Sequence, residues 1–166
     1  MSTWLSGRDV ARLLRAHLPD AVEEEADDCL AVYPGALLDT CRHLQRELAI
    51  DYLNNLTAVD YLDYIEVVYH LSSLERNHLL TIKVRCYDRE HAEVPSLTPL
   101  WQGADLQERE VYDLFGVVFA GHPNLKRLLM WEGFLGHPLR KDFVMPPFPQ
   151  PPGSPVRKRG EELGLD

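Results

Sequence analysis

Residues 52–87 read YLNNLTAVDYLDYIEVVYHLSSLERNHLLTIKVRCY, and they contain three apolar segments separated by short polar turns. In the last segment Leu80, Ile82, Val84 and Cys86 alternate with polar or amphipathic residues. This two-residue period is typical of a half-buried strand. Short connections between neighbouring strands favour an antiparallel meander. Strands are therefore expected at Tyr52–Asp60, Ile65–Leu71 and Leu79–Tyr87.

Two amphipathic helices are expected upstream of these strands. The first covers Gly7–Leu18, where Ser6 can cap the helix start, and the second covers Ala36–Leu48. Two short strands are expected between them, at Ala21–Glu25 and Cys29–Tyr33. The pattern predicts an α+β fold with a mostly antiparallel sheet of about five strands and the two N-terminal helices on one face.

Downstream, Val94-Pro95-Ser96 is expected to end the sheet. Helical patterns then resume around Leu97–Gly103 and Asp105–Phe115, and a short strand is expected at Val117–Phe119. Glycine and proline punctuate the residues that follow, which predicts a long loop.

Composition restricts the class of protein. The net charge of −9 over 166 residues argues against nucleic acid as a partner. No apolar run approaches the ~20 residues that span a bilayer, and no signal-peptide pattern is present, so membrane association is expected only through an assembled complex. Residues 1–143 are expected to form the domain. Residues 144–166 contain six prolines and are expected to form an extended tail.

Familiar catalytic and metal-binding motifs are absent. Cys29, Cys41 and Cys86 form no Cys-x-x-Cys pair, which argues against an iron–sulfur or zinc framework in this chain and favours incidental or buried thiols. There is also no nucleophile elbow, phosphate-binding loop or zinc-protease motif. Asp60 and Asp63 flank an expected hairpin turn, and turn chemistry accounts for both.

Residues 101–143 combine many charges with seven aromatic side chains. On a helix, Asp105, Arg109 and Asp113 fall on one stripe, with the arginine between two carboxylates. Such a stripe could equally consist of routine surface pairs, worth only about 0.3–0.5 kcal/mol each.

The opposite arc of this helix, which is expected to face the core, carries Leu106, Val111, Leu114 and Phe115, and Glu110 falls within it between the two leucines. A buried carboxylate requires a cation or several donors. We therefore expect Glu110 to be the central buried anion of a clamp between the helix and the following loop. The candidate cations in that loop are Arg127, Arg140 and Lys141.

Two Gly-His-Pro triplets, at Gly121 and Gly136, predict rigid corners that hold an imidazole in place. A metal site is the alternative, but no carboxylate or thiol stands at a recognisable ligand spacing. His122 and His137 are therefore expected to be structural, each bonded to a backbone carbonyl or a carboxylate.

Three motifs together carry a family resemblance: EREVYDLFGV at 108–117, GHPNLKRLL at 121–129 and GHPLRKDF at 136–143. They closely resemble the C subunit of NADH-quinone oxidoreductase (respiratory complex I), and the resemblance extends from about residue 50 to about residue 145. The structural and interface signature falls on Glu108, Arg109, Glu110, Asp113, Gly116, His122, Pro123, Arg127, His137, Pro138, Arg140, Lys141 and Asp142.

The resemblance implies a non-catalytic subunit in the hydrophilic arm of a proton-translocating NADH:quinone oxidoreductase. It implies no flavin or cluster in this chain, while FMN, iron–sulfur clusters and quinone are implied in partner subunits. The implied partners are the quinone-site D subunit and the cluster-bearing B and I subunits, on the cytoplasmic side of the cell membrane. The C-terminal segment of such proteins extends over neighbours, although some relatives have longer tails than this chain.

Two alternatives stay open. One is the equivalent subunit of a photosynthetic NDH complex or a membrane-bound hydrogenase-type complex. The other, less favoured, is a free-standing enzyme that uses Glu110, Asp113 and His122 as an acid–base cluster.

Overall fold

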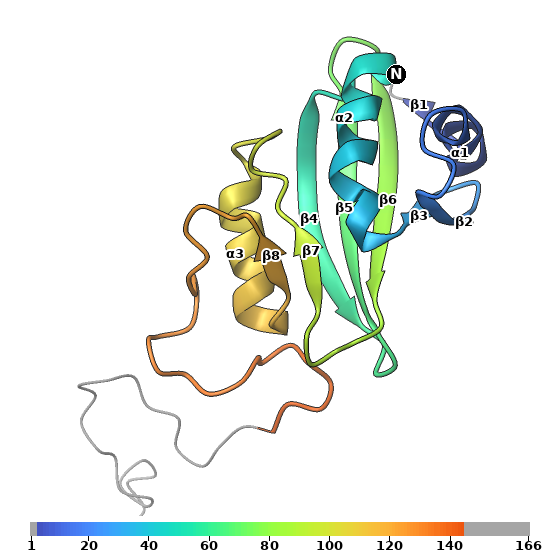
Figure 1. Ribbon diagram of the computed structural model, residues 1–166. Coiled ribbons are helices and arrows are strands. Elements are labelled where there is room, and N and C mark those ends of the chain that lie inside the picture. The colour runs from blue at the N-terminus through green and yellow to red at the C-terminus, as the bar shows by residue number, and fades with distance from the viewer. Residues whose placement is uncertain (1–2, 145–166) are drawn as a thin grey trace, which may run out of the picture.

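The computed structural model describes residues 3–144, and the expected tail beyond Val144 lies outside the described residues. The expected α+β class is confirmed: the described residues contain a mixed six-stranded sheet, a separate strand pair and three α-helices (Figure 1). The elements in chain order are β1 (Thr3–Trp4), α1 (Gly7–Arg15), β2 (Val22–Glu25), β3 (Leu30–Val32), the 3-10 turn η1 (Pro34–Ala36), α2 (Leu37–Leu48), β4 (Tyr52–Asp60), β5 (Ile65–Ser73), β6 (His78–Cys86), β7 (Glu93–Pro95), α3 (Ala104–Phe115) and β8 (Val118–Ala120).

The expected antiparallel meander forms the centre of the large sheet. β5 pairs with β4 on one side and with β6 on the other, so that Val67 lies between Ala58 and Val84. The alternation in β6 has the expected result, because Leu80, Ile82, Val84 and Cys86 are all buried. β4 has the predicted bounds.

The remaining strands add parallel pairs that the meander does not predict. The sheet order is β2-β3-β6-β5-β4, and both β3 and β1 run parallel to β6. Parallel neighbours need a crossover connection, which here contains α2. In Figure 1, α2 crosses in front of β4, β5 and β6, while α1 lies beside β2 and β3. The buried side chains of both helices belong to the core of this sheet.

Both N-terminal helices form, with small differences at their ends. α1 stops at Arg15, three residues before the expected end, and Ser6 makes no side-chain cap bond. α2 begins at Leu37, after η1, and is followed by Ala49 in a left-handed conformation with φ 51°.

The expectations for residues 94–103 were wrong. Glu93–Pro95 does not mark the end of sheet structure; it forms β7 and pairs in parallel with β8. Leu97–Gly103 forms successive turns and no helix. Leu97 and Trp101 are buried. Their four-residue spacing, which suggested a helix, therefore comes from turns whose apolar side chains reach the core.

α3 lies along the outer edge of β4, on the opposite side of the molecule from α1 (Figure 1). The side-chain amide oxygen of Gln107 accepts a 2.6 Å hydrogen bond from the Leu56 backbone N–H. This bond replaces a missing strand partner close to the bulge that β4 contains between Leu53 and Asn55. The edge of the sheet thereby fixes the helix that carries the signature residues.

Replacing Gly7 by alanine should destabilise the fold by at least about 2 kcal/mol. A Cβ at Gly7 would collide with the backbone oxygens of Ala26 and Cys29, at the turn between β2 and β3. Backbone atoms cannot move aside as a side chain can. Urea unfolding of the full chain measures the effect.

The matched control is Gly35→Ala, because a Cβ there meets no atom within 4 Å. It should change the unfolding free energy by less than about 1 kcal/mol. Equal effects of the two substitutions would contradict the close packing of α1 on the β2–β3 turn.

Candidate functional site

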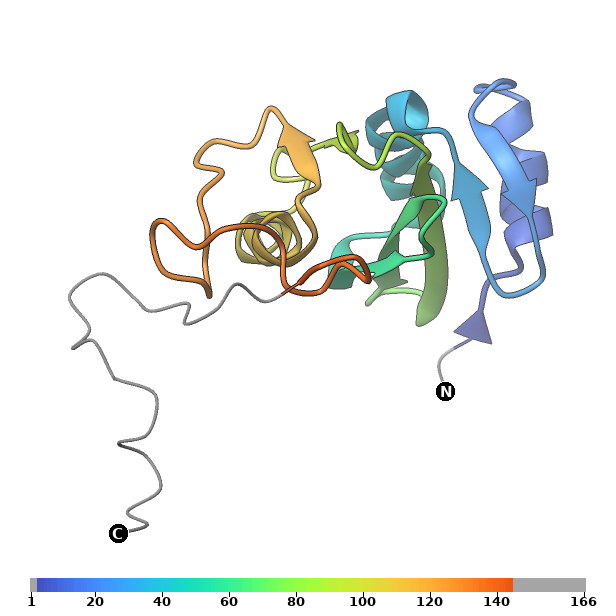
Figure 2. The ribbon, with the colours of Figure 1, turned by 90° about the horizontal axis from the view of Figure 1, so that it is seen from below.

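The C-terminal end of α3 is the centre of the signature region. The last carbonyls of a helix have no partner within the helix. Here the Asp113 oxygen accepts a bond from His137 Nδ1 at 3.0 Å, the Leu114 oxygen accepts one from the Leu139 N–H at 3.0 Å, and the Phe115 oxygen accepts one from Arg140 Nε at 2.6 Å. The segment after β8 therefore caps α3, and Figure 2 shows it wrapping around the helix.

The Asp113 carboxylate anchors the same segment from inside. It is fully buried and lies 2.7 Å from Arg127 Nη1. The backbone N–H groups of Leu128, Leu129 and Met130 donate to its other oxygen at 3.0, 2.7 and 2.8 Å. Burial alone would raise the pKa of Asp113, but the bonds from Met130 and Arg127 bring the pKa below its usual value.

Gly116 is required at the point where α3 ends. Its φ is +76°, in the left-handed region that favours glycine. A Cβ there would also lie 2.6 Å from the His137 ring and 2.9 Å from Arg140 Nη2. Only glycine leaves room for the His137 ring and the Arg140 guanidinium to reach the end of the helix.

A second buried carboxylate, Asp60, holds the end of this segment. Its Oδ2 accepts bonds from Arg89 Nη2 at 2.8 Å and from the Lys141 N–H at 2.9 Å. Arg89 also pairs with Asp142 at 3.2 Å. The turn interpretation of Asp60 was incomplete, because the turn bond from the Leu62 N–H uses only Oδ1. Sequence reasoning missed this centre, since its members come from three distant segments.

The buried anion on α3 is Glu108, and the expectation for Glu110 was wrong. Glu108 is fully buried and accepts 2.6 Å bonds from Ser96 Oγ and from the Leu97 N–H. Glu110 is exposed and has no side-chain hydrogen bond or ion pair within the described part of the chain. Leu106, one turn away, is 57% exposed, whereas Leu114 is partly buried against the core, so the arc as a whole does not face the core.

The expected phase of α3 was right for Val111 and Phe115, which are buried, and wrong for Glu110, which is exposed. Its buried face includes Ala104, Glu108, Val111 and Phe115, a spacing of four, three and four residues. That spacing matches one face of a helix as well as the leucine arc does. The small Ala104 made this face look less apolar in the sequence.

Arg109 also differs from its expected role. It does not lie between two carboxylates; its Nε and Nη2 donate to the carbonyls of Lys126 and Arg127, at 3.1 and 3.4 Å. Of the three candidate cations, Arg127 pairs with Asp113. Arg140 donates to carbonyls, and Lys141 uses its backbone N–H. The expected clamp between helix and loop therefore forms, but Asp113 and not Glu110 is the carboxylate that pairs with Arg127.

Both histidines have the structural role expected of them. His122 Nε2 lies 3.2 Å from the Asp105 carbonyl near the start of α3, and His137 binds the Asp113 carbonyl near its end. Burial lowers the pKa of His137. Pro123 and Pro138 follow these histidines, and neither peptide bond is cis.

The geometry does not assemble an acid–base centre from Glu110, Asp113 and His122. Asp113 is occupied by four donors, His122 lies at the other end of α3, and Glu110 is exposed to solvent. Within residues 3–144 there is also no group of three or more His, Cys, Asp or Glu side chains that could hold a metal ion. The arrangement is suited to holding a long irregular segment rigid.

Asp113→Asn should lower the unfolding free energy by at least about 3 kcal/mol, because it leaves Arg127 without its counter-charge. Glu110→Gln, three residues earlier on the same helix, should change it by less than about 0.5 kcal/mol. Chemical denaturation of the two variants compares them directly.

The decline of the unfolding free energy at acidic pH provides a second test of the Asp113 ion pair. Folding lowers the pKa of the Asp113 carboxyl. Its contribution to the unfolding free energy is therefore fully present above the unfolded-state pKa of 3.8, and it is lost as the pH falls through the folded-state pKa. The decline below about pH 4 should be shallower in Asp113→Asn than in Glu110→Gln. Parallel declines would contradict the ion-pair assignment.

Comparisons with known proteins match this geometry to a family. The family model for the respiratory-chain NADH dehydrogenase 30 kDa subunit matches residues 30–149. The C subunit of NADH-quinone oxidoreductase from Roseiflexus sp. is 45% identical over 147 residues, which cover 83% of this chain and 84% of the relative. The C subunit from Moorella thermoacetica is 47% identical over 134 residues, covering 78% and 90%.

One solved structure has a similar fold, although its complex carries a different name. It is a chain of the membrane-bound sulfane sulfur reductase, an archaeal respiratory membrane complex, with a TM-score of 0.66 and 26% identity over 84% of this chain and 86% of that chain. No helix within residues 3–144 is long and apolar enough to cross a membrane. The extent of the family match and the identity to the bacterial relatives show that the chain belongs to the family of the respiratory-chain NADH dehydrogenase 30 kDa subunit, which includes the C subunits of NADH-quinone oxidoreductase.

Proposed function

We propose that this chain is a non-catalytic subunit of a proton-translocating NADH:quinone oxidoreductase and that it braces the quinone-site D subunit. Support for the partner comes from relatives in which the two subunits are one protein. In Bacteroides fragilis, the C/D subunit of NADH-quinone oxidoreductase is 38% identical over 122 residues, which cover 67% of this chain but only 23% of the longer protein. A sequence of this kind is therefore covalently joined to a D subunit elsewhere, which favours contact between the two.

The observation that carries the proposal is a set of exposed apolar side chains on α3 and the segment after it. Each is more than half exposed: Leu106, Leu129, Leu135, Leu139 and Val144. The buried carboxylates of Asp113 and Asp60 hold the backbone of this segment from beneath. Exposed apolar groups on a fixed framework favour protein docking, because little ordering entropy is lost on binding.

The cysteine chemistry is in keeping with a chain that conducts no electrons. Cys41 and Cys86 are buried, and burial raises the pKa of both thiols, that of Cys86 to about 11. Metal and cluster ligation requires thiolates, which these environments disfavour. In this proposal FMN, the iron–sulfur clusters and quinone are bound by partner subunits.

Further neighbours and a location, which the family resemblance implies, belong to the same proposal. The B and I subunits would lie close to this chain, and the chain would meet the membrane only through the assembled complex, on its cytoplasmic side. The exposed tyrosines Tyr61 and Tyr87, which follow the ends of β4 and β6, offer a further contact area for such neighbours.

A second candidate is the equivalent subunit of a related membrane complex that uses another electron acceptor, such as a hydrogenase-type or photosynthetic NDH complex. The fold match to the sulfane sulfur reductase chain favours keeping this candidate. The higher identity to NADH-quinone oxidoreductase subunits, 45–47% against 26%, favours the first.

The purified full chain should reduce no quinone with NADH, whereas a membrane complex isolated through a tag on this chain should do so. Native mass spectrometry of that complex should detect the D subunit and a flavin-bearing subunit. Quinone reduction by the chain alone would contradict the non-catalytic role. A complex without NADH oxidation would favour the second candidate.

The double substitution Leu129→Asp and Leu139→Asp should reduce recovery of the D subunit on a tagged chain by at least about tenfold. The matched control is Leu74→Asp. Leu74 is 66% exposed on the turn between β5 and β6, which is the turn at the top of Figure 1, far from the signature segment.

Both proteins should keep the thermal stability of the wild type, because the substituted side chains are exposed. If the double variant recovered the D subunit as the control does, the docking surface would lie elsewhere. If the wild type recovered none, the D subunit would not be the partner.

A further inference from the structure

Glu108 differs from the other buried carboxylates of the molecule. Asp60, Glu66 and Asp113 each have an arginine or lysine nitrogen within 2.8, 3.2 and 2.7 Å, respectively. Glu108 has two neutral donors, and within residues 3–144 no lysine or arginine nitrogen lies within 4.0 Å of it. An ionised carboxylate in this position is costly.

The groups that face Glu108 are a histidine, a second carboxylate and a tyrosine. His122 Nε2 lies 3.9 Å from Glu108 Oε2 and 3.5 Å from Asp105 Oδ1, and Asp105 on the preceding turn of α3 adds a second negative charge nearby. Burial and then the Glu108 charge raise the pKa of Tyr69 on β5, whose hydroxyl is buried without a partner among the described residues.

The hydrogen bonds of His122 fit its neutral form. Its Nδ1 accepts a 2.9 Å bond from the Asn124 N–H, so the ring proton is on Nε2, which faces the Asp105 carbonyl at 3.2 Å. A second proton on Nδ1 would break the bond to Asn124. Proton uptake in this cluster is therefore directed to Glu108.

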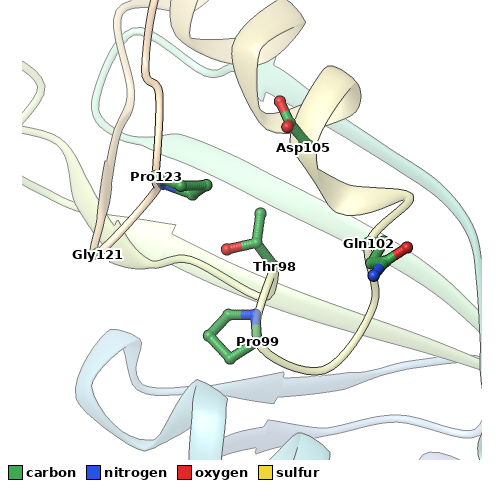
Figure 3. Close-up of a pocket in the computed structure, with 6 residues that line it drawn as sticks. All are labelled: Thr98, Pro99, Gln102, Asp105, Gly121 and Pro123. Atoms are coloured by element: carbon green, nitrogen blue, oxygen red, sulfur yellow. The ribbon is translucent and has the colours of Figure 1, made fainter.

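A cavity lies beside the cluster, and Asp105 is the member of the cluster that lines it. It has a volume of about 520 Å³ and is lined by Thr98, Pro99, Gln102, Asp105, Gly121 and Pro123 (Figure 3). Its walls include the two segments that meet α3 near Glu108. One is the turn at 96–98, which supplies the two donors, and the other is the turn at 121–124, which supplies His122.

We propose that Glu108 is a buried proton-binding group whose ionisation opens the junction of α3 with the turns at 96–98 and 121–124 toward this cavity. In the closed junction, burial raises the pKa of Glu108 to about 7. In an opened, hydrated junction the pKa of the carboxyl has its ordinary value of 4.5. The closed form therefore binds the proton more tightly, and rising pH favours opening until both forms are ionised.

The direction of the effect follows from these two values. Opening should increase by about tenfold per pH unit between about pH 5 and pH 7 and level off above that range. The junction lies wholly within this chain, so the effect does not depend on the proposed partner or electron acceptor.

Amide hydrogen exchange of the full chain between pH 5 and pH 8, corrected for intrinsic exchange rates, tests the proposal. Protection of the Leu97 N–H, which donates to Glu108, should fall about tenfold per unit up to pH 7 in the wild type. In Glu108→Gln it should be independent of pH. In Glu110→Gln, which removes the same charge from the exposed side of α3, it should follow the wild type.

Protection of Leu97 that did not change with pH in the wild type would overturn the proposal, and so would an equal fall in Glu108→Gln. A direct titration covers the case in which Glu108→Gln does not fold. The ¹³C carboxyl shift of Glu108 in the wild-type chain should have its midpoint near pH 7. A Glu108 midpoint below about pH 5 would overturn the proposal.

Discussion

The end of α3 imposes the constraint on which the signature region depends. A helix that stops in the interior leaves carbonyl oxygens that water cannot reach. In this protein the partners are His137, Arg140 and the Leu139 backbone, all from a segment with almost no secondary structure of its own. The hydrogen bonds that cap the helix are therefore also the bonds that order the segment. Two guanidinium groups at this end also oppose the partial negative charge of the helix terminus, which has no basic residue in its own last turn.

The buried charged groups fix the positions of the segments around them more than they add to the free energy of unfolding. A paired buried carboxylate gains little over an apolar replacement, but it accepts several bonds from fixed directions. Asp113 fixes Arg127 and three successive backbone N–H groups, and Asp60 fixes Arg89 and Lys141. Between these two anchors the chain presents apolar side chains outward. A surface ordered before binding loses less entropy when a partner covers it.

The sequence was informative where the relevant contacts were local. The period of two in residues 80–86 and the turns around it were sufficient to predict the β4–β5–β6 meander. The parallel pairing of β3 with β6 could not be predicted. It joins residues that are far apart in the sequence, such as Leu30 and Ile82, and no sequence motif marks either strand as the partner of the other. For α3 the helix and the burial of Val111 and Phe115 were predicted, but Glu110 was placed in the core because Leu106 and Leu114 extended the apolar arc around it. Leu106 belongs to the outer side of the helix and is 57% exposed. The roles of Asp60 and Glu108 were missed for a related reason: most of their donors are backbone and hydroxyl groups that no sequence pattern marks.

The bond from Leu56 to Gln107 has a consequence for self-association of the chain. An open sheet offers unpaired N–H and C=O groups at its edges, and such edges recruit other strands into aggregates. Here α3 lies along β4, and Gln107 occupies a point where another strand would pair. At the far edge, β2 has only four residues, and its three successive glutamates, Glu23–Glu25, form ion pairs with Arg85 and Arg15. This edge is therefore short and charged, which disfavours pairing with a second copy. The two end strands of the order β2-β3-β6-β5-β4 are thus protected from pairing with a second copy, β4 by α3 and β2 by its short, charged sequence.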